Sequence, residues 1–298
     1  MKKLGLSMGC AVLAALLFAS CGNGAQNNAA ETGESFDQTA MITVVSREAS
    51  SGTRGAFDEL MHVVVKDGDN ETDNLFPEAI IVDSTDAVVS KVEVDPSAIG
   101  YTSLGAVNSS VKAVKVDGVS ATVENVLNDT YKIKRPFVLA LPKNSQNPIA
   151  ADFIQFVLSS DGQAIAEHTS LIKAAASDTA YTPKKLSGKL TLSGSTSVEK
   201  VMEKLREEYI KLNPDVQVEI TYSGSGAGIK DAIAGKVDIA MSSRALKDEE
   251  KTSLDENVFA LDAIAVIVNA ENPIDALTSE QITNIFTGIT RTWADAAK

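Results

Sequence analysis

The feature that most constrains this chain is a predicted strand that leads through a loop of small polar residues into a helix. Residues 42–45 form a β-branched run, which indicates a buried strand, and a helix is predicted from Ala56 onward. The loop from Ser50 to Thr53 has no bulky side chain. Because the first N–H groups of a helix lack internal partners and carry partial positive charge, an oxyanion can approach them through such a loop. Arg47 adds donors that suit the same ligand.

The same arrangement occurs twice more in the second half of the chain. Residues 189–212 predict a strand, a serine-rich loop and an amphipathic helix, in that order. Residues 216–234 predict the same elements, with a loop of serine, glycine and alanine at 223–228. One loop of this kind is usually an ordinary helix cap. Three of them in one chain indicate a shared anionic ligand.

The first residues predict export from the cytoplasm. Lys2 and Lys3 precede an apolar run at 11–18, which is typical of a secretory signal and too short to span a membrane. Small residues then lead to Cys21, as in a bacterial lipoprotein signal. We therefore expect residues 1–20 to be a signal peptide that is removed. Lipidated Cys21 would then anchor the protein to the extracytoplasmic face of the cell membrane.

Composition separates a tether from a folded region. Residues 21–40 have few apolar side chains and predict a disordered tether. The remaining chain is long enough for two compact lobes, and the hydrophobic fraction of 44% is ordinary for a globular protein. The net charge of −13 argues against a nucleic-acid partner, which would need a basic surface. A small anion stays possible, because the overall field is screened over about 8 Å whereas backbone donors act at contact distance.

The residues that catalysis and metal binding need are scarce. Cys10 lies in the predicted signal and Cys21 would carry lipid, so the mature chain would have no thiol. His62 and His168 are the only histidines and have no zinc-site spacing. Residues 223–230 lack the Gly-Lys-Ser/Thr ending of a nucleotide phosphate loop, and no nucleophile with a base accompanies the loops. We expect no enzyme activity, no metal and no cofactor.

The remaining pattern predicts an α/β fold. Residues 79–83 and 98–101 read as strands with a helix between them, and such alternation is typical of parallel or mixed sheets with helices on their faces. A long extended run at 131–141 is interrupted by Pro136, which suits an edge or a connection between lobes. Residues 174–186 lose periodicity and predict a linker.

Together these stretches resemble the phosphate-binding proteins of phosphate ABC transporters. The segments that carry the resemblance are 47–53, 159–163, 193–197, 223–228, 237–244, 259–269, 285–288 and Trp293. It covers essentially the whole chain from Met41 onward. It implies a two-lobe clamp of the type 2 periplasmic-binding-protein-like fold, in which each lobe is a mixed sheet flanked by helices. It also implies a monomer that captures inorganic phosphate in the cleft and delivers it to permease subunits.

The order of the segments differs from the usual order in that family. In the usual order the loop with Gly194 comes first and the loop with Arg47 follows the segment with Trp293. The present order resembles a circular permutation in which residues 174–188 join the old ends. It predicts that Lys298 and Met41 lie near each other, because new termini are tolerated best in exposed loops. The lobes implied are 41–135 plus 263–298, with the Arg47 loop, and 136–262, with the Gly194 and Gly224 loops.

The resemblance also assigns the residues that bind phosphate. In one lobe these are Ser195, Thr196, Ser197, Ser225 and Ser243; in the other they are Arg47, Ser51, Gly52 and Thr53. Their roles are those of backbone, hydroxyl and guanidinium donors. Several charge-assisted hydrogen bonds that converge on one anion can support tight binding.

Two departures from the family pattern leave the identity of the anion open. Well-known members have an aspartate at the place of Ser243, and it accepts a proton that phosphate carries and sulfate lacks. Ala49 stands where an acid can pair with Arg47, and Glu48 is the candidate replacement. Discrimination would then depend on Ser243, on Glu48 or on another group. The alternatives are a receptor for another tetrahedral oxyanion, such as sulfate, and a surface or signalling lipoprotein without a transport role.

Overall fold

The structure, a computed structural model, describes residues 36–67, 70–173 and 178–298. The chain divides into a first unit, residues 1–35, and a compact unit from Phe36 to Lys298. The predicted signal peptide, Cys21 and most of the predicted tether lie outside the described residues. In the described ranges, no helix is both long and apolar enough to cross a membrane.

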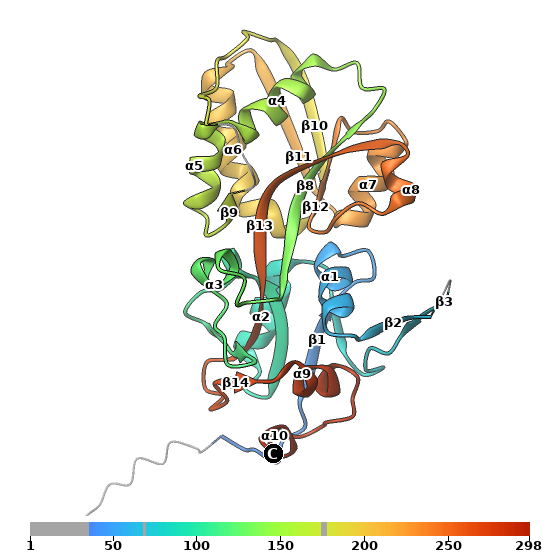
Figure 1. The fold of residues 1–298 in the computed structure, drawn as a ribbon, viewed down its shortest axis with the longest axis vertical. Coiled ribbons are helices and arrows are strands. Elements are labelled where there is room, and N and C mark those ends of the chain that lie inside the picture. The colour runs from blue at the N-terminus through green and yellow to red at the C-terminus, as the bar shows by residue number, and fades with distance from the viewer. Residues whose placement is uncertain (1–35, 68–69, 174–177) are drawn as a thin grey trace, which may run out of the picture. The chain divides into compact units, whose positions relative to one another are not determined.

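The compact unit is built from strands and helices that largely alternate along the chain (Figure 1). The strands are β1 Thr43–Arg47, β2 Val64–Asp67, β3 Asn70–Asp73, β4 Ile80–Val82, β5 Ala98–Ser103, β6 Val111–Ala113, β7 Lys115–Val116, β8 Lys134–Pro142, β9 Ile172–Lys173, β10 Gly188–Gly194, β11 Val216–Tyr222, β12 Ile239–Ser242, β13 Leu254–Asn269 and β14 Ala276–Leu277. The α-helices are α1 Gly52–Leu60, α2 Thr85–Val94, α3 Val123–Leu127, α4 Pro148–Leu158, α5 Ser160–Glu167, α6 Glu199–Leu212, α7 Ser225–Ile233, α8 Asp248–Lys251, α9 Ser279–Phe286 and α10 Trp293–Ala296. Short 3-10 turns are η1 Leu104–Ala106 and η2 Thr196–Val198.

One curled sheet connects the whole unit, in the order β11-β10-β12-β8-β13-β5-β1-β4. At one end β10 runs parallel to β11 and β12, and at the other end β1 runs parallel to β4 and β5. The long strand β13 joins the ends, since its first part is antiparallel to β8 and its second part antiparallel to β5. Strands β8 and β13 therefore pass side by side between the two parts of the molecule (Figure 1).

Two large hydrophobic cores lie on either side of this crossing. The first takes its buried side chains from 42–133 and 263–296, with Ile172 added, and includes the stacked rings of Phe57 and Tyr101. The second takes them from 137–260. We call the elements around these cores the first lobe and the second lobe. This arrangement confirms the predicted two-lobe, periplasmic-binding-protein-like fold with mixed sheets and flanking helices.

Pro136 lies in the crossing part of β8. Its strand partner is Leu261 of β13, whereas β12 pairs with β8 only from Val138 to Ala140. One side of β8 therefore has no β12 partner at Pro136, which suits a residue without an N–H donor. The prediction of an edge or a connection between lobes is confirmed at this residue.

The folded unit begins earlier than the sequence pattern indicated. The ring of Phe36 packs edge-on against Trp293, with 6.3 Å between centroids. The N–H of Ala294 in α10 donates to the carbonyl of Gln38 at 2.7 Å. Residues 36–40, which we expected in the tether, thus make ordered contacts with the C-terminal helix. Met41 itself forms an antiparallel bridge with Thr292.

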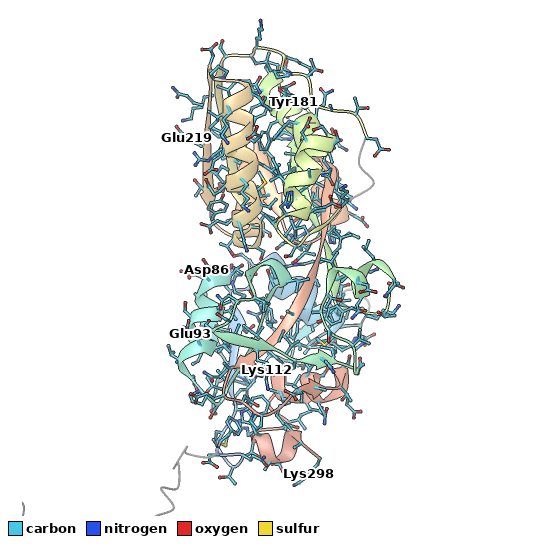
Figure 2. All side chains as sticks on the ribbon, turned by 90° about the vertical axis from the view of Figure 1, so that its left-hand side faces the viewer. Asp86, Glu93, Lys112, Tyr181, Glu219 and Lys298 are labelled. Carbon is cyan, nitrogen blue, oxygen red and sulfur yellow. The ribbon has the colours of Figure 1, made fainter. Side chains whose placement is uncertain are left out.

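The described part of the predicted linker is held to the helices of the second lobe. The hydroxyl of Tyr181 donates to Asp152 Oδ2 at 2.5 Å, and the hydroxyl of Tyr209 donates to the same oxygen at 2.8 Å. Lys184 Nζ lies 3.1 Å from the other carboxylate oxygen of Asp152. Figure 2 shows Tyr181 beside these helices, far from Asp86 at the start of α2. The linker is therefore fastened at a distance from the lobe boundary.

Candidate functional site

Helices from both lobes begin at the boundary between them. In the first lobe α1 follows directly after β1, and Ser51 caps it by accepting from the N–H of Arg54 at 3.3 Å. Helix α2 begins in the same way after Ser84, whose hydroxyl accepts from the N–H of Ala87 at 3.2 Å. In the second lobe η2 and α7 begin after β10 and β11. The three predicted loops are thus confirmed as strand-to-helix turns, and α2 adds a fourth helix start.

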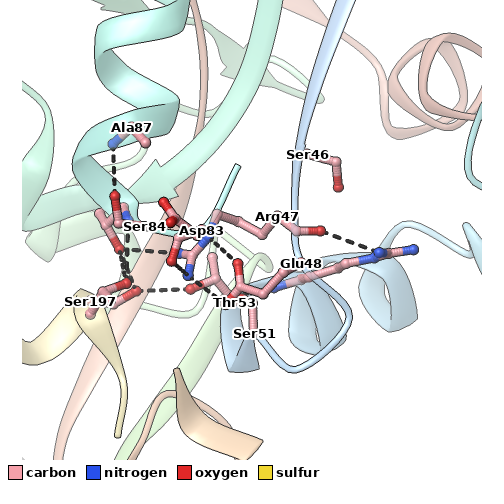
Figure 3. A network of polar contacts seen from close by, with 12 residues as sticks. Ser46, Arg47, Glu48, Ser51, Thr53, Asp83, Ser84, Ala87 and Ser197 are labelled. Atoms are coloured by element: carbon pink, nitrogen blue, oxygen red, sulfur yellow. Dashed lines mark hydrogen bonds and ion pairs between the residues drawn. The ribbon is translucent and has the colours of Figure 1, made fainter. Parts of the chain in front are cut away.

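Hydroxyl groups of the two lobes meet between these helix starts (Figure 3). Ser197 Oγ lies 2.8 Å from Thr53 Oγ1 and 3.0 Å from Thr85 Oγ1. Thr85 Oγ1 also lies 3.1 Å from Thr196 Oγ1. Either atom can be the donor in each pair, so the protons of this hydroxyl chain can reorient toward a ligand.

Gly52 brings the start of α1 close to two serines of the second lobe. Ser225 Oγ and Ser243 Oγ are 3.3 Å apart, and the N–H of Ser243 donates to Ser225 Oγ at 3.1 Å. A Cβ atom on Gly52 would lie only 2.4 Å from Ser225 Oγ and 2.7 Å from Ser243 Oγ. The first lobe can approach this closely because residue 52 has no side chain.

Arg47 is the cation of the site, and its side chain is 2% exposed. Its Nε and Nη2 donate to the two carboxylate oxygens of Glu48 at 2.9 and 3.0 Å, and Nη1 donates to Thr85 Oγ1 at 3.3 Å. Glu48 is therefore the acid that pairs with this arginine, as predicted for a chain with Ala49 (Figure 3). A bidentate pair of this kind fixes the plane of the guanidinium.

Two of the predicted ligand residues also have roles inside their own turns. The N–H of Ser51 donates to the carbonyl of Glu48 at 2.9 Å, and Ser195 Oγ accepts from the N–H of Ser197 at 3.2 Å. The N–H of Ser195 donates to the carbonyl of Met241 at 2.9 Å, so the backbone amides of Ser51 and Ser195 are both used and their hydroxyl protons are the donors left for a ligand. All nine predicted residues nevertheless lie in the three predicted strand-to-helix turns or directly after β12, beside the boundary between lobes.

A buried ion pair that was not predicted from the sequence lies next to the Ser243 turn. Nε and Nη2 of Arg135 in β8 donate to Asp262 Oδ2 in β13 at 3.1 and 2.9 Å. Ser103 Oγ donates to Asp262 Oδ1 at 2.8 Å, and Arg135 Nη1 donates to the carbonyl of Ser243 at 3.4 Å. Burial raises the pKa of Asp262, although Arg135 acts in the opposite direction. The pair thus links both crossing strands to the Ser243 turn.

Two cavities are lined by residues of both lobes. The larger, of about 770 Å³, is lined from the first lobe by residues such as Ser50 and from the second by residues such as Gly226 and Arg244. The smaller, of about 530 Å³, has Thr85 on one wall and Lys200 on the other. Both lobes line each cavity, so each cavity lies at the lobe boundary, and the smaller one includes Thr85, Thr196 and Ser197 of the hydroxyl cluster.

Arg54 connects α1 to the strand that carries Arg47. Its Nη1 donates to the carbonyl of Arg47 at 3.2 Å, its Nη2 pairs with Asp73, and its Nε donates to Asp58 Oδ2 at 3.1 Å. Burial raises the pKa of Asp58 to about 6, and Arg54 opposes this rise only in part. The carboxylate of Asp58 is therefore costly to keep charged in the folded protein.

Asp58 should make the folded protein less stable as pH rises. Its pKa lies above the ordinary value, so between about pH 4 and 6 the folded state binds more protons than the unfolded state and stability falls with rising pH. The slope is at most about 1.4 kcal/mol per pH unit. We expect Asp58→Asn to remove this component when the free energy of unfolding is measured at pH 5 and 7.5. Glu59→Gln, next to it but exposed, is the control, and equal slopes for wild type and Asp58→Asn would contradict the prediction.

The crossing strands and the donors that face each other define a two-lobed solute-binding protein. A family model described as a PBP superfamily domain matches residues 27–161 and 174–298, so the chain belongs to that superfamily. Within this superfamily, the chain belongs to the family of phosphate-binding proteins named PstS, because two of them are 44% identical to it over most of its length. In the described residues, no three His, Cys, Asp or Glu side chains are grouped to hold a metal.

Two of the relatives match most of the chain, and a third matches a smaller part of it. Phosphate-binding protein PstS 2 of Streptococcus agalactiae is 44% identical over 259 residues, which are 86% of this chain and 88% of that protein. A crystal structure of a phosphate-binding protein of a phosphate ABC transporter from Streptococcus pneumoniae is 43% identical and has a TM-score of 0.70. It covers 86% of this chain and all of that one. Phosphate-binding protein PstS of Staphylococcus saprophyticus is 38% identical over 116 residues, 36% of each protein.

Proposed function

We propose that this chain captures inorganic phosphate between its two lobes and delivers it to the permease subunits of an ABC transporter. The observation that carries the proposal is that donors from both lobes meet at one place, with Thr53 and Ser197 hydroxyls 2.8 Å apart. A ligand that binds groups on both lobes stabilises the closed arrangement, and a partner can recognise that arrangement. The relatives named above are phosphate-binding proteins, which supports phosphate as the ligand.

We propose that the phosphate ligands are the nine residues assigned from the sequence. These are Ser195, Thr196, Ser197, Ser225 and Ser243 of the second lobe and Arg47, Ser51, Gly52 and Thr53 of the first. The set combines one guanidinium with hydroxyl and backbone donors and contains no carboxylate. Hydrogen bonds to a charged group each contribute about 1.5–3 kcal/mol before desolvation and ordering costs are subtracted. These nine residues can therefore bind a small anion tightly and reversibly.

Sulfate is the second candidate, because of how the nearby carboxylates are used. Glu48 is paired with Arg47, and Asp262 is paired with Arg135. Acceptance of a phosphate proton then depends on a neutral hydroxyl, such as that of Ser243, which already contacts Ser225. A hydroxyl discriminates less strongly than a carboxylate, since it does not repel a fully deprotonated anion.

Calorimetry of the purified chain with phosphate, arsenate and sulfate tests both candidates. We expect saturable binding of phosphate and arsenate, which carry a proton near neutral pH, and little heat with sulfate. Equal affinity for sulfate would favour a general oxyanion receptor. Absence of binding to all three anions would leave the proposal without support, and the remaining reading would be a surface or signalling lipoprotein.

We also propose that the receptor acts as a monomer anchored through lipidated Cys21 on the extracytoplasmic face of the membrane, after loss of signal peptide 1–20. The match to the superfamily model begins at residue 27, so Cys21 and the segment before it lie outside the matched residues. A tether between Cys21 and the folded unit would let the clamp move relative to the membrane.

The circular permutation is likewise a proposal, and contacts between the chain ends support it. Met41 bridges to Thr292, and the N–H of Ile42 donates to the carbonyl of Arg291 at 2.8 Å. The match to the Staphylococcus saprophyticus protein covers only 36% of each chain, as expected where segment order differs. The proposed lobes remain 41–135 plus 263–298, and 136–262, in agreement with the sources of the two cores.

A further inference from the structure

Thr85 lies among the proposed phosphate ligands, although the sequence pattern indicated only a helix between residues 83 and 98 there. Its side chain is in the first turn of α2 and is buried. Thr85 Oγ1 lies 3.0 Å from Ser197 Oγ and 3.1 Å from Thr196 Oγ1, both on the second lobe. On its own lobe it accepts from Arg47 Nη1 at 3.3 Å. One threonine thus contacts three of the residues assigned to the anion.

The backbone of Thr85 faces the same place. Ser84 caps the helix through the N–H of Ala87, so the N–H of Thr85 is not used by that cap. It donates instead to Thr196 Oγ1 at 3.2 Å, across the lobe boundary. Helix α2 has ten residues, and this N–H lies at its N-terminus, where the helix carries partial positive charge.

The hydrogen-bond inventory favours a ligand over a purely structural role. Thr85 Oγ1 has one proton and three polar neighbours, and each hydroxyl pair can exchange donor and acceptor. Around Thr85 the chain provides a guanidinium, an amide and four hydroxyls, those of Thr53, Thr85, Thr196 and Ser197. The polar contacts of Thr85 itself involve no carboxylate. This surplus of donors matches an oxygen-rich anion.

We propose that Thr85 is a further residue of the oxyanion site, and that its hydroxyl and its N–H both donate to the bound anion, which replaces Thr196 Oγ1 as the acceptor of that N–H. The inference rests on the proposed function, because it places Thr85 in the same site. In this position α2 becomes the second helix of the first lobe, after α1, whose start faces the ligand. The sequence-based set of nine ligands is therefore incomplete by one.

Thr85→Val tests the hydroxyl while it keeps the shape and the backbone N–H. We expect phosphate to bind about 10- to 100-fold more weakly, the range for loss of one hydrogen bond to a charged ligand. Thr85→Ser restores the hydroxyl and should stay within about threefold of wild type. Thr102→Val is the matched control, because Thr102 in β5 is also buried and its hydroxyl has no hydrogen-bond partner among the described residues.

A second comparison separates direct contact from an effect through Arg47. In an Arg47→Lys background, direct contact predicts that Thr85→Val still weakens binding by most of its original factor. If the effect of Thr85→Val disappears in that background, Thr85 only orients Arg47 and the proposed contact is wrong. Thr85→Ala serves as a second variant, and thermal unfolding shows that each protein is folded.

The outcomes distinguish this inference from the proposed function. A wild-type chain that binds phosphate, together with a Thr85→Val variant that binds as tightly as Thr102→Val, overturns the role of Thr85 alone. A folded wild-type chain that binds none of the three oxyanions overturns both proposals. Weakening by Thr85→Val with recovery in Thr85→Ser supports both.

Discussion

Replacing Arg47 with alanine is expected to weaken phosphate binding by at least about 100-fold while the protein stays folded. Arg47 is the one cation among the proposed ligands, and its fork is held in place by Glu48 at 2.9 and 3.0 Å. Its loss removes charge-assisted hydrogen bonds to the anion. It also leaves the Glu48 carboxylate without its partner, and this unpaired negative charge repels the anion. Calorimetry gives the dissociation constant, and thermal unfolding checks that the fold is retained.

Arg291→Ala is the matched control for Arg47→Ala. Arg291 belongs to the same lobe, and its guanidinium lies over the ring of Phe76, 4.7 Å from the centroid. Its pairing with Glu78 is loose, at 3.8 Å, and both side chains are exposed. This substitution removes the same charge and should leave affinity unchanged. The double variant Arg47→Ala/Glu48→Ala measures how much of the loss comes from the unpaired carboxylate. A wild-type dissociation constant for Arg47→Ala would refute the proposed site.

The strand-to-helix turns could be predicted because their causes are local. A β-branched run, small residues and a capping hydroxyl are all visible within about ten residues, as in the segment from Val44 to Arg54. The pairing of Glu48 with Arg47 also follows from neighbouring positions. These local patterns predict a sharp turn followed by a helix. The structure has such a turn at each predicted place.

The residues that the sequence reading missed depend on contacts between distant parts of the chain. Thr85 meets Thr196 across 111 positions, and Arg135 meets Asp262 across 127. The local sequence around Thr85 does not distinguish it from an ordinary helix-cap residue. The local sequences around Arg135 and Asp262 do not distinguish them from surface charges. One signal was available, because the extended run at 131–141 contains Arg135 and the largely apolar run at 259–269 contains Asp262, two side chains of opposite charge. The end of the tether was misplaced for a similar reason, since Phe36 is ordered by Trp293 at the far end of the chain.

The buried pair of Arg135 and Asp262 leads to the largest stability effect that we expect. Their side chains are 1% and 0% exposed, and they stand opposite each other in β8 and β13. Removing one partner leaves a buried charge uncompensated, which typically costs about 3–5 kcal/mol. We therefore expect Arg135→Met and Asp262→Leu each to lower the free energy of unfolding by about that amount. Denaturant unfolding measures it, with Lys211→Met, in the exposed pair with Glu208, as the control.

The double variant Arg135→Met/Asp262→Leu distinguishes pairing from simple packing. A buried ion pair gains little over apolar side chains of similar volume, so the double variant should recover most of the stability that either single variant loses. In Arg135→Met alone, burial still raises the pKa of Asp262 and the opposing charge is gone. The folded state then binds a proton more strongly than the unfolded state, and the variant should become less stable as pH rises above the ordinary aspartate range. If the two single losses simply add in the double variant, the side chains act independently and the pair does not hold the crossing strands together.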